Sequence, residues 1–241
     1  MQTRNDHPKG HLSGKVVLIT GAGRGLGRRL ALAFARQGAF VAANDITPIN
    51  LDETVAQVEA AGGCIRPYLE DIASKLAIQT LLAAVLDDWG RIDVLVNHAQ
   101  VRPRSSLLEI DEWDWRRAID VNLTGAVLLI QSVAREMRAR NQDNQGNGQI
   151  INLAPPDGPA AFTASKAGLA GLTAQAATEL QAYNIHINTI CPFSGEPVPD
   201  REGLPVPLQA ARTVSELAVL LCSPAAASLT GLVIEFADES A

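Results

Sequence analysis

Cysteines are few in this sequence, and long apolar runs are missing. The three cysteines, Cys64, Cys191 and Cys222, are an odd number without a C-x-x-C pair, so we expect buried, reduced thiols rather than a disulfide framework. No run of about 18 apolar residues could span a membrane, and the opening MQTRNDHPKGHLSG lacks the apolar core of a secretion signal. These absences predict a cytoplasmic protein with no membrane partner and no metal site.

Positive charge and aromatic residues are also scarce. The chain carries 20 Lys and Arg against 26 Asp and Glu, a formal net charge of −6, with no dense basic stripe after the N-terminal tail. Nucleic acids bind to basic faces, so we expect no nucleic-acid partner. Aromatic residues make up 4% of the chain and hydrophobic residues 47%. Such an aliphatic composition suits helices packed on a parallel sheet better than a β-sandwich.

Apolar runs that suit strands alternate with longer helical patterns, which is typical of a doubly wound sheet. The predicted strands cover residues 15–20, 39–45, 64–71, 92–99, 148–155, 185–191 and 231–238. The predicted helices cover residues 25–37, 51–61, 74–88, 111–139, 161–181 and 213–223. We therefore expect an α/β protein with a Rossmann fold, in which a seven-stranded, mainly parallel sheet carries helices on both faces.

The 241 residues show no internal repeat and no linker. We expect a single domain over residues 14–241, after a flexible tail at 1–13. The polar segment NQDNQGNGQ at 141–149 and the proline-rich segment at 191–207 are predicted to be loops.

A glycine-rich turn follows the first predicted strand. Gly21, Gly25 and Gly27 in TGAGRGLG are spaced G-x-x-x-G-x-G, where a tight turn lets the start of a helix meet a pyrophosphate. Such glycines by themselves could also serve only helix packing on the strand. Asp45 ends the second predicted strand about 20 residues further on, where its carboxylate can accept hydrogen bonds from ribose hydroxyls. It would repel a 2′-phosphate, which favours NAD over NADP, although Arg24 could partly offset that repulsion.

In these residues the chain resembles the short-chain dehydrogenase/reductase family, from about Lys15 to Asp238. Further motifs carry the resemblance: LEDIAS, VNHA, VNLTG, ASKAGL and the closing LTGLVIEFAD. The resemblance implies a Rossmann fold and a bound NAD(P). It also implies a set of residues that hold this dinucleotide: Gly21, Arg24, Gly25, Leu26, Gly27, Asp45, Asp71, Asn97, Ala99 and Lys166.

The resemblance fails at the residues that carry the family's chemistry. Members of the family move a hydride between the nicotinamide and a carbinol carbon, with a Tyr as acid and base, a Lys beside it, a Ser on the substrate oxygen and an Asn holding a water relay. Asn122 and Lys166 match two of these catalytic positions, but Phe162 stands at the Tyr position. Ala154 and Pro155 stand where the Ser is expected. A phenyl ring can neither give nor take a proton, so efficient family chemistry is not expected.

Other departures fall on the same side of the predicted site. Gln100 replaces the last Gly of the Asn-Asn-Ala-Gly motif, and Phe193 replaces a Gly after Pro192. The segment between Pro155 and Phe162 is shorter than in the family, and the lid segment is reduced to a proline-rich loop. The adenine half of the predicted site is therefore complete, whereas the nicotinamide and substrate half has lost its characteristic residues.

Two functions remain open at this point. One is a nucleotide-binding family member with weak or no catalysis; the other is an active NAD(P)-dependent oxidoreductase with a different proton donor, either His98 or the substrate itself. His98 could also simply bond the backbone, and Lys166 could simply satisfy a carbonyl. The long helices at 111–139 and 161–181 resemble those through which relatives associate, so we expect a homodimer or homotetramer.

Overall fold

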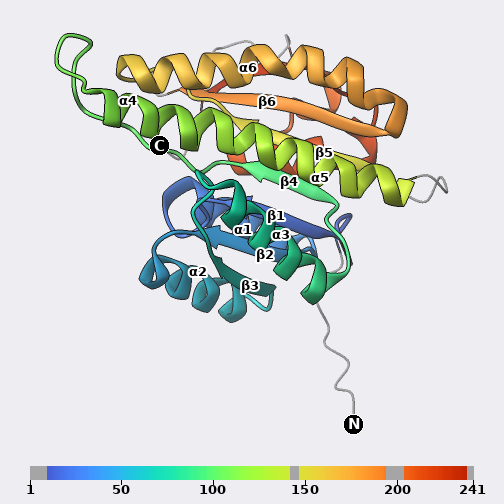
Figure 1. Ribbon diagram of the computed structural model, residues 1–241. Helices are drawn as coiled ribbons and strands as arrows, with labels where there is room; N and C mark the ends of the chain where they lie inside the picture. Colours follow the sequence, from blue (N-terminus) through green and yellow to red (C-terminus); the bar gives the residue numbers. More distant parts are fainter. Residues whose placement is uncertain (1–9, 142–146, 194–203, 238–241) are drawn as a thin grey trace.

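The structure is a computed structural model that describes residues 10–141, 147–193 and 204–237 (Figure 1). Seven strands form one sheet in the order β3-β2-β1-β4-β5-β6-β7, and each described pair is parallel. The predicted doubly wound, seven-stranded sheet is thus confirmed. The strands are β1 Val16–Thr20, β2 Phe40–Asp45, β3 Cys64–Leu69, β4 Val94–Asn97, β5 Gly148–Leu153, β6 Ile185–Phe193 and β7 Val233–Ala237.

The sheet separates two apolar cores. Side chains alternate along each strand, so Val17 and Ile19 of β1 lie in one core and Val16 and Leu18 in the other. Helices α1, α2 and α7 close the first core, and α3, α5 and α6 close the second (Figure 1). The helices are α1 Gly25–Arg36, α2 Pro48–Ala60, α3 Lys75–Trp89, α4 Glu112–Ile119, α5 Ala126–Asn141, α6 Ala160–Leu180 and α7 Val214–Leu221.

The predicted helical segment at 111–139 is confirmed, since the chain is helical from Glu112 to Asn141, but it is not α-helical throughout. A π-helical turn at Asp120–Gly125 separates α4 from α5. Gly125 packs so closely on the loop between β3 and α3 that a Cβ atom there would lie 2.4 Å from the carbonyl oxygen of Ile72. π-Helical turns often mark functional sites, and this one carries Asn122.

Smaller differences concern the ends of elements. Helix α2 begins at Pro48, before the predicted start at residue 51, because a proline is well tolerated in the first helical turn. Strand β6 continues to Phe193, so the start of the predicted loop at 191–207 is strand instead. Leu12 is buried and its N–H donates to the carbonyl of Gln37, so packing begins inside the predicted tail. Most of that tail lies outside the described residues. Residues 142–146 and 194–203, in the two predicted loops, also lie outside them.

The order of the strands creates a crevice at one edge of the sheet. The chain runs from β1 to β2 and β3 on one side, and the later strands β4 to β7 extend on the other. Loops that follow β1 and β4 therefore diverge, and in open α/β sheets ligands bind at this switch point. Among the described helices, none is long and apolar enough to cross a membrane.

Candidate functional site

The glycine turn after β1 is built for close packing. Gly21 has a φ of 68°, which a glycine adopts without strain. A Cβ atom at Gly27 would lie 2.0 Å from the carbonyl oxygen of Gly21, so only a glycine fits inside this first turn of α1. Helix α1 begins without a side-chain cap from Arg24. Its first N–H groups are therefore suited to an anionic ligand.

Side chains behind the turn hold its carbonyl groups. The hydroxyl of Thr54 lies 3.0 Å from the carbonyl oxygens of both Ala22 and Gly23. Arg28 donates from Nη2 to the Gly23 carbonyl at 2.7 Å and pairs with Glu53. These contacts turn the carbonyl groups of the loop toward the protein. Neither Thr54 nor Arg28 was predicted as a site residue, since neither belongs to the glycine motif.

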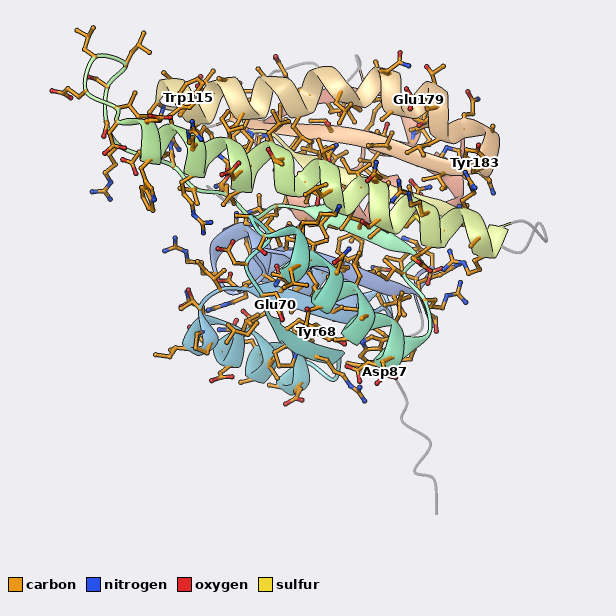
Figure 2. All side chains as sticks on the ribbon, viewed as in Figure 1. Tyr68, Glu70, Asp87, Trp115, Glu179 and Tyr183 are labelled. Atoms are coloured by element: carbon orange, nitrogen blue, oxygen red, sulfur yellow. The ribbon has the colours of Figure 1, made fainter. Side chains whose placement is uncertain are left out.

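A polar cavity of about 280 Å³ lies beyond the ends of β2 and β3. Asp45 lines this cavity, and its carboxylate accepts hydrogen bonds from the backbone N–H groups of Gly23 and Thr47, each with an N···O distance of 3.0 Å. Each carboxylate oxygen keeps a further lone pair for a ligand hydroxyl. Asp71 also lines the cavity and pairs with Arg117 of α4 at 2.9 Å, and Glu70, labelled in Figure 2, lies beside it. The structure thus brings the two predicted carboxylates together around one cavity.

A second cavity of about 260 Å³ lies on the other side of the glycine turn. It is lined by Arg24, Gly25, Leu26, His98, Gln100, Leu153 and Pro155. Of these residues, Arg24, His98 and Gln100 also line the first cavity, so they stand at the boundary between the two. The predicted residues Arg24, Gly25 and Leu26 therefore face the crevice.

His98 is fixed by the backbone of the glycine turn. Its Nδ1 lies 3.1 Å from the carbonyl oxygen of Gly21, and because a carbonyl can only accept, Nδ1 carries the proton. Burial, together with the nearby charge of Lys166, lowers the pKa of His98 to about 4. The imidazole is therefore neutral at neutral pH, with a lone pair on Nε2. A group in this state is a hydrogen-bond acceptor and not a ready acid.

Asn122 connects three segments through its amide. Its Oδ1 accepts the N–H of Val101 at 2.7 Å, and its Nδ2 donates to the Val101 carbonyl at 2.8 Å. The same Nδ2 donates to the hydroxyl of Ser165 at 3.0 Å, and this hydroxyl donates to the carbonyl of Phe162 at 2.7 Å. Asn122 thereby ties the loop after β4 to the start of α6. Sequence reasoning assigned no role to Ser165, which is the link in this chain of hydrogen bonds.

Phe162 is fully buried. The guanidinium of Arg102 lies 5.1 Å from the centre of its ring and donates to the carbonyl of Asp157. A Cβ atom at Gly158 would lie 2.4 Å from the ring, so the shortened loop packs directly on the phenyl group. Arg102 was not predicted as a site residue, because no motif includes it.

Lys166 is also buried, with 2% of its surface exposed. Its Nζ donates to the carbonyl of Leu153 at 2.9 Å. Burial lowers the pKa of Lys166 to about 7. Within the described part of the chain, neither Phe162 nor Lys166 lines the two cavities. The residues at the catalytic positions therefore contact the protein itself rather than the crevice.

The remaining predicted residues lie at the carboxyl edge of the sheet. Asn97 of β4 donates to the side chain of Asn152 at 2.9 Å, and the N–H of Ala99 donates to Thr20 at 3.1 Å. These contacts join neighbouring strands and support the base of the crevice. In the described segments, no three His, Cys, Asp or Glu side chains gather as a metal site would require.

Comparisons with known proteins agree with this geometry. The family model for short chain dehydrogenases matches residues 15–195. The chain is 37% identical to the 3-oxoacyl-acyl-carrier-protein reductase FabG of Thermotoga maritima over 182 residues, which are 75% of this chain and 74% of that protein. A solved short chain dehydrogenase from Mycobacterium avium matches with a TM-score of 0.82 at 30% identity, over 94% of this chain and 83% of that one. Xylitol dehydrogenase with bound NAD⁺ matches with a TM-score of 0.80 at 27% identity, over 93% and 98%.

We predict that Gly27→Ala destabilises the protein by about 1–3 kcal/mol, because the added methyl group overlaps a backbone oxygen that cannot move aside. Gly171→Ala is the matched control, since it also lies in a helix but its Cβ atom would meet nothing within 4 Å. That control should leave stability unchanged or raise it by up to about 1 kcal/mol. Urea unfolding measures both variants, and equal effects would contradict the assigned packing.

Proposed function

The chain belongs to the short-chain dehydrogenase family, and from that premise we propose that it binds NAD in preference to NADP and performs the family's hydride transfer weakly or not at all. One observation carries the proposal. Asp45 and Asp71 face an open cavity beside the glycine turn, whereas Phe162 and Lys166 are buried away from it. The protein would act as a nucleotide-binding member with a degenerate catalytic site.

The residues on the adenosine side fit the ADP half of a dinucleotide. Gly21, Gly23 and Gly27 let the turn pack closely against its neighbours, and the uncapped start of α1 beside it can receive the pyrophosphate. The carboxylate of Asp45 can accept hydrogen bonds from ribose hydroxyls and would repel a 2′-phosphate. The bound NAD⁺ of the similar xylitol dehydrogenase supports the same cofactor class for this chain.

The nicotinamide side does not supply a proton. A bound nicotinamide would provide the hydride or accept it, and the protein would still have to protonate or deprotonate the substrate oxygen. Phe162 has no ionisable group, and Pro155 has neither a hydroxyl nor a backbone N–H. A positioned acid or base contributes about 10²–10⁴-fold to such a reaction. Turnover should fall by a comparable factor below that of a complete site.

An active oxidoreductase with another acid is the competing function. His98 is the nearest candidate, because it lines both cavities. Its Nδ1 proton is held by Gly21, however, and its low pKa leaves it without a second proton to donate at neutral pH. Substrate-assisted chemistry would need no such group. NADH consumption with a panel of carbonyl compounds separates these functions, since sustained turnover would favour the active enzyme.

We expect Asp45→Ala to lower the preference for NAD over NADP by at least about tenfold, because the carboxylate that repels the 2′-phosphate is removed. Calorimetric dissociation constants for NAD and NADP in both proteins give the ratio. A ratio is informative even if the variant loosens the glycine turn, since both ligands would then lose affinity together. An unchanged ratio would show that Asp45 does not contact the ribose.

Phe162→Tyr should not restore turnover, because the ring is enclosed by Gly158, Arg102 and the protein core, where its hydroxyl cannot reach a substrate. The assay is NADH oxidation with the same carbonyl panel. Phe34→Tyr adds a hydroxyl to another fully buried ring and controls for the loss of stability that this addition causes. A gain of about 10² or more in the first variant would show that the phenol position is open to substrate.

We further propose that the protein forms a homodimer or homotetramer through α5 and α6, which lie side by side in Figure 1. The outer face of α6 carries small exposed residues: Ala164, Ala167, Gly168, Gly171 and Ala174. Small side chains permit close approach of a second helix. Trp115 of α4 is also partly exposed, at the end of the molecule where α4 contacts α6 (Figure 2).

Gly171→Glu should convert a dimer to monomers, or a tetramer to a smaller oligomer, because a long charged side chain would stand where two helices approach. The single chain tolerates the change, since nothing lies within 4 Å of the added Cβ atom. Light scattering gives the mass, with Gly171→Ala as the control that keeps the face small. A monomeric mass for the unmodified protein would refute the proposed assembly.

A further inference from the structure

We propose that Arg102 is a latch that closes the substrate side of the crevice: its side chain fastens the loop after β4 to Asp157 and Phe162 and keeps Lys166 out of reach. The inference rests on the proposed function in one respect, since it takes Phe162 and Lys166 as the family's catalytic positions. It deepens that function because it names a contact that holds these positions closed.

The guanidinium of Arg102 contacts two parts of one segment at once. Its Cζ lies 5.1 Å from the centre of the Phe162 ring, and its Nη2 donates to the carbonyl of Asp157 at 3.0 Å. A cation within about 6 Å of a ring centre is attracted to the negative face of the ring. A guanidinium can contact a ring and also donate hydrogen bonds from its edge, which the ammonium of a lysine cannot match. The side chain therefore joins the loop after β4 to α6 and to the loop before it.

The backbone before Arg102 is anchored without its side chain. Val101 makes two hydrogen bonds with the amide of Asn122, at 2.7 and 2.8 Å. The same amide reaches the carbonyl of Phe162 through the hydroxyl of Ser165. Since none of these contacts uses the guanidinium, the two segments should stay in place when the side chain of Arg102 is removed. Its removal would then open the latch and leave the frame around it intact.

The ring under the latch also contacts Lys166. Phe162 and Lys166 are four residues apart on α6, so their side chains lie on one face of the helix. The Nζ of Lys166 lies 5.9 Å from the centre of the Phe162 ring. Both side chains are buried. Arg102 and Lys166 therefore contact the same ring, and a change that lets this ring move also changes access to the amine.

The loop before α6 is a second cover on the ring. A Cβ atom at Gly158 would lie 2.4 Å from Phe162, and the hydroxyl of Thr163 donates to the Gly158 carbonyl at 2.9 Å. Asp157 and Gly158 are exposed. Exposed loops open locally at a lower free energy than the core of a protein. Arg102 supplies a contact from outside this segment that holds the loop on the ring.

Four lysines make access to Lys166 measurable: Lys9, Lys15, Lys75 and Lys166. Lys75 is exposed and gives the rate at which a reagent modifies an open amine. Lys15 comes directly before β1, at the amino edge of the sheet, and pairs with Asp93 at 3.7 Å. Because Lys15 lies far from the latch, it reports on general loosening of the fold.

Limited acetylation of the full-length protein, followed by mass spectrometry of its peptides, measures the rate at each lysine. In Arg102→Ala, the rate at Lys166 relative to Lys75 should rise at least about tenfold above that of the unsubstituted protein, because an aromatic contact and a hydrogen bond are lost together. Arg104→Ala is the matched control, since Arg104 is an exposed arginine on the same loop. That control should leave the ratio unchanged.

Arg102→Gln is a second, milder variant. Its side chain keeps an N–H donor that can bond the Asp157 carbonyl, but it places no charge over the Phe162 ring. The rate at Lys166 should therefore rise, and by less than in Arg102→Ala.

An unchanged rate at Lys166 in both Arg102 variants would overturn the latch. A parallel rise at Lys15 would overturn it too, because loosening of the whole fold would then explain the labelling. Calorimetric titration of the same proteins with NAD separates this result from the proposed function. Binding of NAD with unchanged labelling of Lys166 refutes the latch alone, whereas faster labelling without any NAD binding supports the latch and refutes the proposed nucleotide binding.

Discussion

The Asn122 amide is the constraint on which the arrangement of this crevice depends. It satisfies both backbone groups of Val101 and, through Ser165, reaches the carbonyl of Phe162. A buried amide that lost these partners would cost about 1–3 kcal/mol for each unsatisfied group. The π-helical turn that carries Asn122 places it between the loop after β4 and the start of α6. The hydrogen bonds through Ser165 thus join this turn to α6, the helix that carries Phe162 and Lys166.

That arrangement divides the crevice into two unequal parts. The glycine turn and the carboxylates beyond β2 and β3 line one cavity, and contacts from Thr54 and Arg28 hold the turn in place. On the other side, polar groups at the catalytic positions have found partners within the protein. The Leu153 carbonyl accepts one hydrogen bond from Lys166. These internal contacts are consistent with the weak catalysis that we propose.

Much of this fold could be predicted, because strands buried on both faces appear as continuous apolar runs and the helices between them as longer periodic segments. The π-helical turn between α4 and α5 could not be predicted in this way. The apolar pattern continues through residues 120–125, where Gly125 packs closely against the Ile72 carbonyl, far away in the sequence. Site residues within motifs, such as Gly27 and Asp45, were identifiable for the same local reason. Arg102, Arg117 and Thr54 belong to no motif and were missed.

The sequence by itself determined the chain's fold, the glycine turn with its carboxylate partner, and the absence of a phenol and a hydroxyl at the catalytic positions. These features depend on residue type and short spacing. Only the tertiary structure decided which partners the polar groups take. His98 bonds Gly21 across 77 positions, Arg102 bonds Asp157 across 55, and Lys166 bonds Leu153 across 13. These contacts depend on distances that exist only after the strands have been brought side by side.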